Sequence, residues 1–93
     1  MKKLGQILLA KDTLELIGSL DTIVNDITFD SRQVKKGSCF IAVRGTQADG
    51  HGYIDKAVEL GASAIVCEVL PEKMVKGITY ARVKDTTEVL GRH

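Results

Sequence analysis

The sequence has no tryptophan, two phenylalanines, two tyrosines and a formal net charge of only +1. So few rings exclude a base-stacking platform of several aromatic side chains. Because acidic and basic residues are nearly balanced, the sequence offers no excess of positive charge for binding nucleic acid or an anionic membrane. No apolar run approaches the roughly 20 residues that cross a bilayer, and Lys11, Asp12 and Glu15 come too early for a secretory signal. We therefore expect a cytoplasmic protein that binds neither nucleic acid nor membrane.

Cysteine is also scarce, with two residues in the chain. Cys39 and Cys67 each lie in an apolar run, which is typical of reduced thiols buried in a core. The two cysteines and the two distant histidines lack the local spacing of a zinc site. We expect no metal site and no disulfide framework.

The 93 residues suffice for one domain, and 44% hydrophobic with 27% charged residues is a globular composition. Residues 39–43 and 64–67 are uninterrupted apolar runs, typical of central strands covered on both faces. Between these two runs, apolar side chains recur at the spacing of a helix, at Tyr53, Ile54, Ala57, Val58 and Leu60. Gly61 stands at the position that ends such a helix. Strand, helix and strand predict a right-handed parallel βαβ unit.

The flanking segments predict a helix over residues 3–10 and strands over 14–17, 23–29 and 78–83. Imperfect alternation over 23–29, with Ile23, Ile27 and Phe29 on one face, suits an edge strand. Asp85 followed by Glu88 predicts the start of another helix. We therefore expect an α/β fold in three layers, with a mixed, mostly parallel sheet and helices on both faces.

A loop bracketed by Gly45 and Gly50 has the spacing of a phosphate-binding P-loop. In a P-loop, the second glycine is followed by Lys and then by Ser or Thr. This chain has His51 and Gly52 at those two positions, so we expect no ATP hydrolysis here. Small residues before a helix still expose backbone N–H groups, which suits an anion or the edge of a heterocycle. Equally, the loop fits a glycine-bracketed turn in which Asp49 and His51 only cap the helix.

A second polar turn, Asp30-Ser31-Arg32, follows a predicted strand. It is typical of an Asx turn with an ordinary surface cation, but a serine hydroxyl beside an arginine also suits a phosphate or diphosphate. The sequence contains no recognisable nucleophile–base pair or carboxylate dyad, and His51 has no identifiable orienting partner. We expect no catalytic residue in this chain.

The two polar loops belong to a longer series of residues whose order and spacing resemble those of a known family. Its members are Asp30-Ser31-Arg32, Val34, Gly37, Phe40-Ile41-Ala42, Gly45, Asp49-Gly50-His51, Tyr53-Ile54, Ala57 and Gly61-Ala62. From about residue 23 to 68, this series resembles the N-terminal, UDP-binding domain of the Mur ligases of peptidoglycan synthesis. Within that family it is most similar to the MurE type, the UDP-N-acetylmuramoyl-tripeptide synthetases.

The resemblance implies part of an ATP-dependent amide ligase that adds the third amino acid to UDP-N-acetylmuramoyl-dipeptide. Residues 1–84 would form the UDP-substrate-binding domain, and residues 85–93 would begin a helix or linker toward an absent central ATPase domain. The expected partners are that substrate and the central and C-terminal domains. No cofactor is expected in this fragment, whereas the full-length enzyme would need ATP and Mg²⁺. The fragment alone is expected to be inactive.

The resemblance also assigns roles by position. Contacts to the UDP moiety are expected from Phe29, Ser31, Thr46, Gln47 and Ala48. A loop-shaping role is expected for Asp30, Arg32, Gly45, Asp49, Gly50 and His51. Two alternatives stay open: a MurF-type ligase that adds the terminal dipeptide, and a stand-alone nucleotide-binding module. The identity of the third amino acid is left open, because the C-terminal domain would select it.

Overall fold

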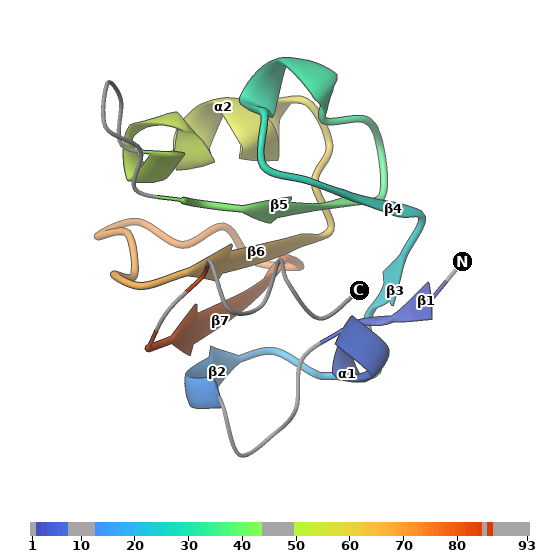
Figure 1. The fold of residues 1–93 in the computed structure, drawn as a ribbon, viewed down its shortest axis with the longest axis vertical. Coiled ribbons are helices and arrows are strands. Elements are labelled where there is room, and N and C mark those ends of the chain that lie inside the picture. The colour runs from blue at the N-terminus through green and yellow to red at the C-terminus, as the bar shows by residue number, and fades with distance from the viewer. Residues whose placement is uncertain (1, 8–12, 44–49, 85, 87–93) are drawn as a thin grey trace.

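The computed structural model describes residues 2–7, 13–43, 50–84 and 86, and these form an α/β arrangement around a five-stranded sheet (Figure 1). The strands are β1 (Lys2–Lys3), β2 (Thr13–Ile17), β3 (Ile23–Val24), β4 (Asp26–Thr28), β5 (Ser38–Ile41), β6 (Ala64–Cys67) and β7 (Thr79–Val83). The helices are α1 (Leu4–Ile7) and α2 (Ile54–Glu59), with 3-10 turns η2 (Ser31–Gln33) and η3 (Gly50–Tyr53).

The large sheet has the strand order β2-β7-β6-β5-β4, and β1 pairs separately with β3. The neighbours β4, β5, β6 and β7 are parallel, and β2 runs antiparallel to β7 at one edge. Successive parallel strands step across the sheet in one direction, so right-handed connections place η2 and α2 on the same face. Figure 1 shows these two elements together at the top of the view. The predicted mixed, mostly parallel sheet is confirmed.

Alternation along the central strands divides the core into two clusters. Cys39 and Ile41 of β5 join one cluster, while Phe40 between them joins the other. The first cluster receives Leu4 from α1, and the second receives Ile54 and Ala57 from α2. Because these clusters lie on opposite faces of β5, helices cover both faces as predicted.

The βαβ unit at the centre matches the sequence prediction closely. All four residues of β5 and all four of β6 are buried, as expected for strands covered on both faces. Helix α2 ends in a Schellman motif: Ala62 donates its N–H to Ala57 O at 3.1 Å and Gly61 donates to Val58 O at 3.1 Å. Gly61 has φ +107°, a backbone conformation that a side chain disfavours.

Both thiols are buried and free, as predicted. Cys39 belongs to the first core cluster and Cys67 to the second, so the sheet itself separates them. Burial raises the pKa of Cys39 to about 12 and that of Cys67 to about 11. None of the described helices has the length and apolar character needed to traverse a bilayer.

The prediction of one continuous strand over residues 23–29 was wrong. The chain breaks at Asn25, whose N–H donates to Gly37 O at 2.8 Å and whose side-chain amide donates to Lys36 O at 3.2 Å. The break resets the alternation, so Val24 and Ile27 pack against the same cluster although three positions separate them. Because β4 ends at Thr28, Phe29 lies outside the strand and is exposed. The edge position predicted for this segment is confirmed for β4.

Two helix predictions also needed correction. The segment expected as one helix over residues 3–10 begins with strand β1, and α1 covers only Leu4–Ile7, while residues 8–12 lie outside the described part. Tyr53 was expected on the buried face of the central helix, but it is the N-cap of α2 and 47% exposed. Its φ of −108° and ψ of 6° are not helical, so the helical period does not apply to it. The predicted helix from Asp85 falls outside the described residues, apart from Thr86.

Candidate functional site

The candidate site lies at the end of the sheet where the carboxyl ends of β4 and β5 meet. Strand β4 leads into η2, and β5 leads toward η3 and then α2. Since β4 and β5 are parallel neighbours, both exits are on the same edge, and η2 packs beside α2. Open α/β sheets bind ligands at such an edge.

Asp30 and Arg32 fix the first turn by a dense set of hydrogen bonds. Asp30 Oδ1 accepts the backbone N–H of Arg32 at 2.9 Å, which makes Asp30 the N-cap of η2. The guanidinium also binds both carboxylate oxygens, from Nε to Oδ1 at 3.1 Å and from Nη2 to Oδ2 at 3.0 Å. This bidentate pairing uses two of the five N–H donors of Arg32 and holds the side chain over its own turn.

The charges of this pair reinforce each other. The hydrogen bond from the Arg32 side chain is the largest cause that lowers the pKa of Asp30 below its ordinary value. In return, Asp30 raises the pKa of Arg32, and Tyr53 adds a smaller electrostatic contribution in the same direction. The packing of η2 beside α2 brings the start of that helix close to the first turn.

Thr28, the last residue of β4, ties this turn to the sheet. Its Oγ1 accepts the N–H of Asp30 at 3.0 Å, and Thr28 itself is only 8% exposed. Gln33 N–H then donates to Asp30 O at 3.0 Å, which closes the 3-10 turn. The turn therefore has a fixed place relative to the strand ends.

Ser31 and Phe29, expected contacts of the UDP moiety, flank Asp30 in very different environments. Ser31 is 8% exposed within η2, whereas Phe29 is 64% exposed at the end of β4. An exposed aromatic ring next to a rigid polar turn offers an apolar surface for a planar group. The structure brings these residues together with the Asp30–Arg32 pair on one short segment.

The second predicted loop is described only at its end. Gly45, Thr46, Gln47, Ala48 and Asp49 lie outside the described residues, and Gly50 and His51 are described as backbone at the start of η3.

The residues that follow this loop do not fit Mg-ATP. Positions 51 and 52 carry His51 and Gly52 in place of the lysine and hydroxyl that a P-loop provides. Among the described residues, no group of His, Cys, Asp or Glu side chains is arranged to hold a metal ion. The loop between Gly45 and Gly50 is therefore not followed by the side chains that a P-loop uses to hold Mg-ATP.

Sequence reasoning missed the exposure of Tyr53 at this edge. Its position before the buried residues of α2 made it look like part of their apolar face, yet η3 turns it outward. Whether Tyr53 is buried or exposed depends on where α2 begins. A helical period alone does not place that boundary accurately.

Comparison with known proteins gives consistent matches. The model described as "Mur ligase family, catalytic domain" matches residues 23–92. The chain is 44% identical over 90 residues to the UDP-N-acetylmuramoyl-L-alanyl-D-glutamate--2,6-diaminopimelate ligase of Phocaeicola vulgatus, covering 97% of this chain and 19% of that protein. The protein of the same name from Clostridioides difficile is 39% identical over 90 residues, with 97% and 18% covered. The chain thus spans about a fifth of the length of these relatives.

Solved structures give a similar result. The MurF ligase from Thermotoga maritima in complex with ADP matches with a TM-score of 0.61 and 32% identity, covering 82% of this chain and 17% of that one. A crystal structure of MurF from Acinetobacter baumannii matches with a TM-score of 0.65 and 28% identity, covering 73% and 14%.

Proposed function

This chain belongs to the Mur ligase family, and on that premise we propose that it is the UDP-binding part of a MurE-type ligase. The complete enzyme would use ATP to join the third amino acid to UDP-N-acetylmuramoyl-dipeptide. The observation that carries this proposal is the 44% identity across 97% of the chain to a ligase whose name specifies UDP-N-acetylmuramoyl-L-alanyl-D-glutamate. The acceptor dipeptide would then be L-alanyl-D-glutamate, as in that name.

The geometry of the first turn supports a role in holding the UDP end. Phe29 offers a ring for the uracil, and Ser31 offers a hydroxyl for the diphosphate. Asp30 and Arg32 act by keeping the turn rigid, because the Arg32 guanidinium donates two hydrogen bonds to the Asp30 carboxylate. Rigid placement lowers the entropy lost when a ligand binds. Thr46, Gln47 and Ala48 complete the proposed pocket, with Gly45, Asp49, Gly50 and His51 shaping their loop.

Two observations favour the MurE type over the MurF type. The curated MurE-type relatives are 44% and 39% identical over 97% of the chain, whereas the MurF structures are 32% and 28% identical over 82% and 73%. Similar folds with lower identity fit two branches of one family.

ATP and Mg²⁺ belong to the complete ligase in this proposal and not to this chain, whose degenerate loop lacks the lysine and hydroxyl they require. The ADP complex of the Thermotoga maritima MurF is consistent with nucleotide chemistry elsewhere in such enzymes. The partners would be the UDP-linked dipeptide and the remaining domains of the ligase. The enzyme would work in the cytoplasm, where nucleotide-linked precursors and ATP are available.

Binding to this chain tests the UDP assignment. In ¹⁵N-labelled protein, UDP and UDP-N-acetylmuramoyl-dipeptide should shift the amide signals of Phe29, Ser31 and residues 45–51. Ser31→Ala and Phe29→Ala should weaken these shifts, because each removes a proposed contact. Gln33→Ala is the matched control, since Gln33 is an exposed residue of the same turn. Shifts that avoid both segments would refute the site.

Activity of the complete protein separates the rival functions. A MurE-type ligase should extend UDP-N-acetylmuramoyl-dipeptide in the presence of ATP and ignore the tripeptide-carrying precursor. Preference for the tripeptide precursor and a D-alanyl-D-alanine donor would instead establish the MurF type. UDP binding without any ligation would support the stand-alone nucleotide-binding module.

A further inference from the structure

A buried contact near the end of the described chain lies outside the nucleotide site. Thr86 has no exposed surface, and it donates two hydrogen bonds to one oxygen of Glu68. The Thr86 backbone N–H reaches Glu68 Oε2 at 3.2 Å, and the Thr86 hydroxyl reaches the same oxygen at 3.0 Å. Hydrogen bonds to a carboxylate are about twice as strong as neutral ones. The contact joins residues that are 18 positions apart.

Glu68 follows a buried central strand of the sheet. It directly follows β6, whose four residues are fully buried between β5 and β7. The pairing of β6 with β7 ends where Cys67 meets Arg82. The Glu68 backbone therefore begins at a fixed point on the carboxyl edge, the same edge from which β4 and β5 lead to the nucleotide site.

The position of Thr86 requires a change in chain direction. Continued straight, three residues beyond Val83 would carry the chain about 10 Å past the sheet. The chain instead bends at Lys84 and brings Thr86 within hydrogen-bonding distance of the Glu68 carboxylate. The Glu68 carboxylate, directly after β6, thus accepts both hydrogen bonds that hold Thr86 beside the sheet.

We propose that Glu68 is a positioning residue whose carboxylate fixes the direction in which the chain leaves this domain at Thr86. This inference rests on the proposed function, in which the chain continues from here toward the ATP-binding domain. The substrate carboxylate must meet ATP across that boundary, while this domain holds the UDP end. An error of about 1 Å in such an arrangement reduces turnover roughly 100-fold. Glu68 therefore acts on turnover and not on UDP binding.

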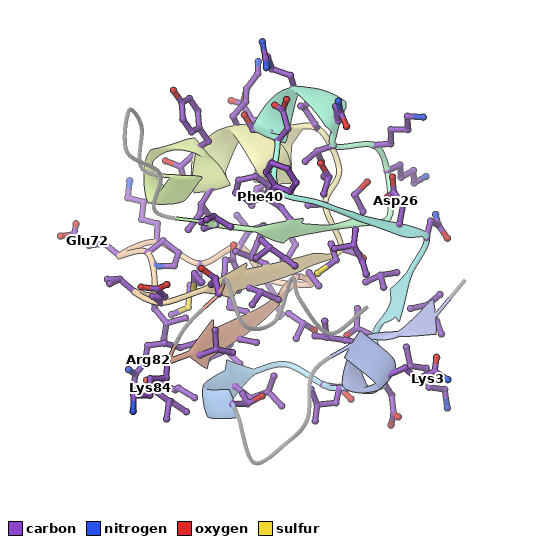
Figure 2. All side chains as sticks on the ribbon, viewed as in Figure 1. Lys3, Asp26, Phe40, Glu72, Arg82 and Lys84 are labelled. Carbon is purple, nitrogen blue, oxygen red and sulfur yellow. The ribbon has the colours of Figure 1, made fainter. Side chains whose placement is uncertain are left out.

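Hydrogen exchange in this chain tests the contact without reference to ligation. In Glu68→Ala, the Thr86 amide should exchange about tenfold faster or more, because it loses a charged acceptor. Glu68→Gln keeps an oxygen acceptor and should restore part of the protection. Glu72→Ala is the matched control, since Glu72 is exposed on the loop after β6 and points away from the ribbon (Figure 2). Unchanged Thr86 exchange in Glu68→Ala would overturn the proposal.

Steady-state kinetics of the complete ligase test the consequence. Glu68→Ala should lower kcat by about tenfold to a hundredfold, with the KM for the UDP-linked substrate nearly unchanged. Glu68→Gln should recover part of kcat, and Glu72→Ala should behave as wild type. Faster Thr86 exchange with an unchanged kcat would refute the positioning role. An inactive wild-type protein would refute the proposed function alone, because the exchange experiment still decides whether Glu68 holds Thr86.

Discussion

The glycine after helix α2 offers a quantitative test of how tightly this domain is packed. A Cβ added at Gly61 would lie 2.9 Å from Lys36 Cα, which is closer than real Cβ atoms come to the backbone. Gly61 also has φ +107°. Gly61→Ala therefore combines two penalties, a disfavoured backbone conformation and a collision with a backbone that cannot rotate away.

Two other glycines separate these penalties. Gly77 has φ +95° with nothing within 4 Å of an added Cβ, whereas Gly52 has open space and no such φ. The left-handed conformation costs about 1–2 kcal/mol, and forcing an extra carbon into a packed site costs about 1–3 kcal/mol. We expect Gly77→Ala to lose about 1–2 kcal/mol and Gly61→Ala about 2–5 kcal/mol. Gly52→Ala should be neutral or stabilising by about 0.4–1 kcal/mol.

Urea unfolding followed by far-ultraviolet circular dichroism measures these differences, and it suits a chain without tryptophan. In a domain of this size, each kcal/mol also shifts Tm by about 4–8 °C. The slope of unfolding free energy against urea should be the same in all variants, so that midpoints compare directly. Equal losses in Gly61→Ala and Gly77→Ala would refute the collision, and an equal loss in Gly52→Ala would refute the conformational argument.

Three further predictions concern ionisation and hydrogen bonding. Burial raises the pKa of Cys39 to about 12 and that of Cys67 to about 11, so between about pH 9 and about pH 11 only the unfolded state releases these protons. Stability should then fall by about 1.4 kcal/mol per pH unit for each thiol, and urea unfolding should show a shallower decline when both are alanine. Arg32 lowers the pKa of Asp30, so this pair stabilises the fold above the unfolded pKa and loses that effect as the pH falls. An NMR titration should show the Asp30 pKa returning toward its ordinary value in Arg32→Leu, and an unchanged pKa would contradict the pairing. Tyr80→Phe removes a buried hydroxyl that accepts a backbone N–H of the loop after β6 at 2.9 Å, and it should cost about 1 kcal/mol in thermal unfolding.

The centre of the fold was readable from the sequence because its signals are local. An uninterrupted apolar run has few alternatives to a buried strand, and the predicted strand at Ala64–Cys67 is the observed β6. The end of α2 was equally clear, since Gly61 satisfies the Schellman geometry without strain. The same holds for the Asx geometry of Asp30, which needs only a partner two residues away.

Features that depend on distant partners were not readable. The break at Asn25 is fixed by Gly37 and Lys36, and no pattern within residues 23–29 indicates that those groups are near. Glu68 likewise meets Thr86 only because β6 and β7 are neighbours in the sheet. The UDP contacts stay predictions, because Thr46, Gln47 and Ala48 lie outside the described residues and their role came from resemblance alone.

The antiparallel strand at the edge of the sheet has a consequence for synthesis of the chain. Strand β2 is made early, yet Thr13 pairs with Val83, which the ribosome adds 70 residues later. Until β7 emerges, β2 lacks the strand with which it pairs in the described sheet, and the side of β6 that β7 will cover is an open edge. Pairing between such distant segments is slow because a long loop must close first. The described sheet is therefore completed late in synthesis, when β7 arrives between β2 and β6, which are already made.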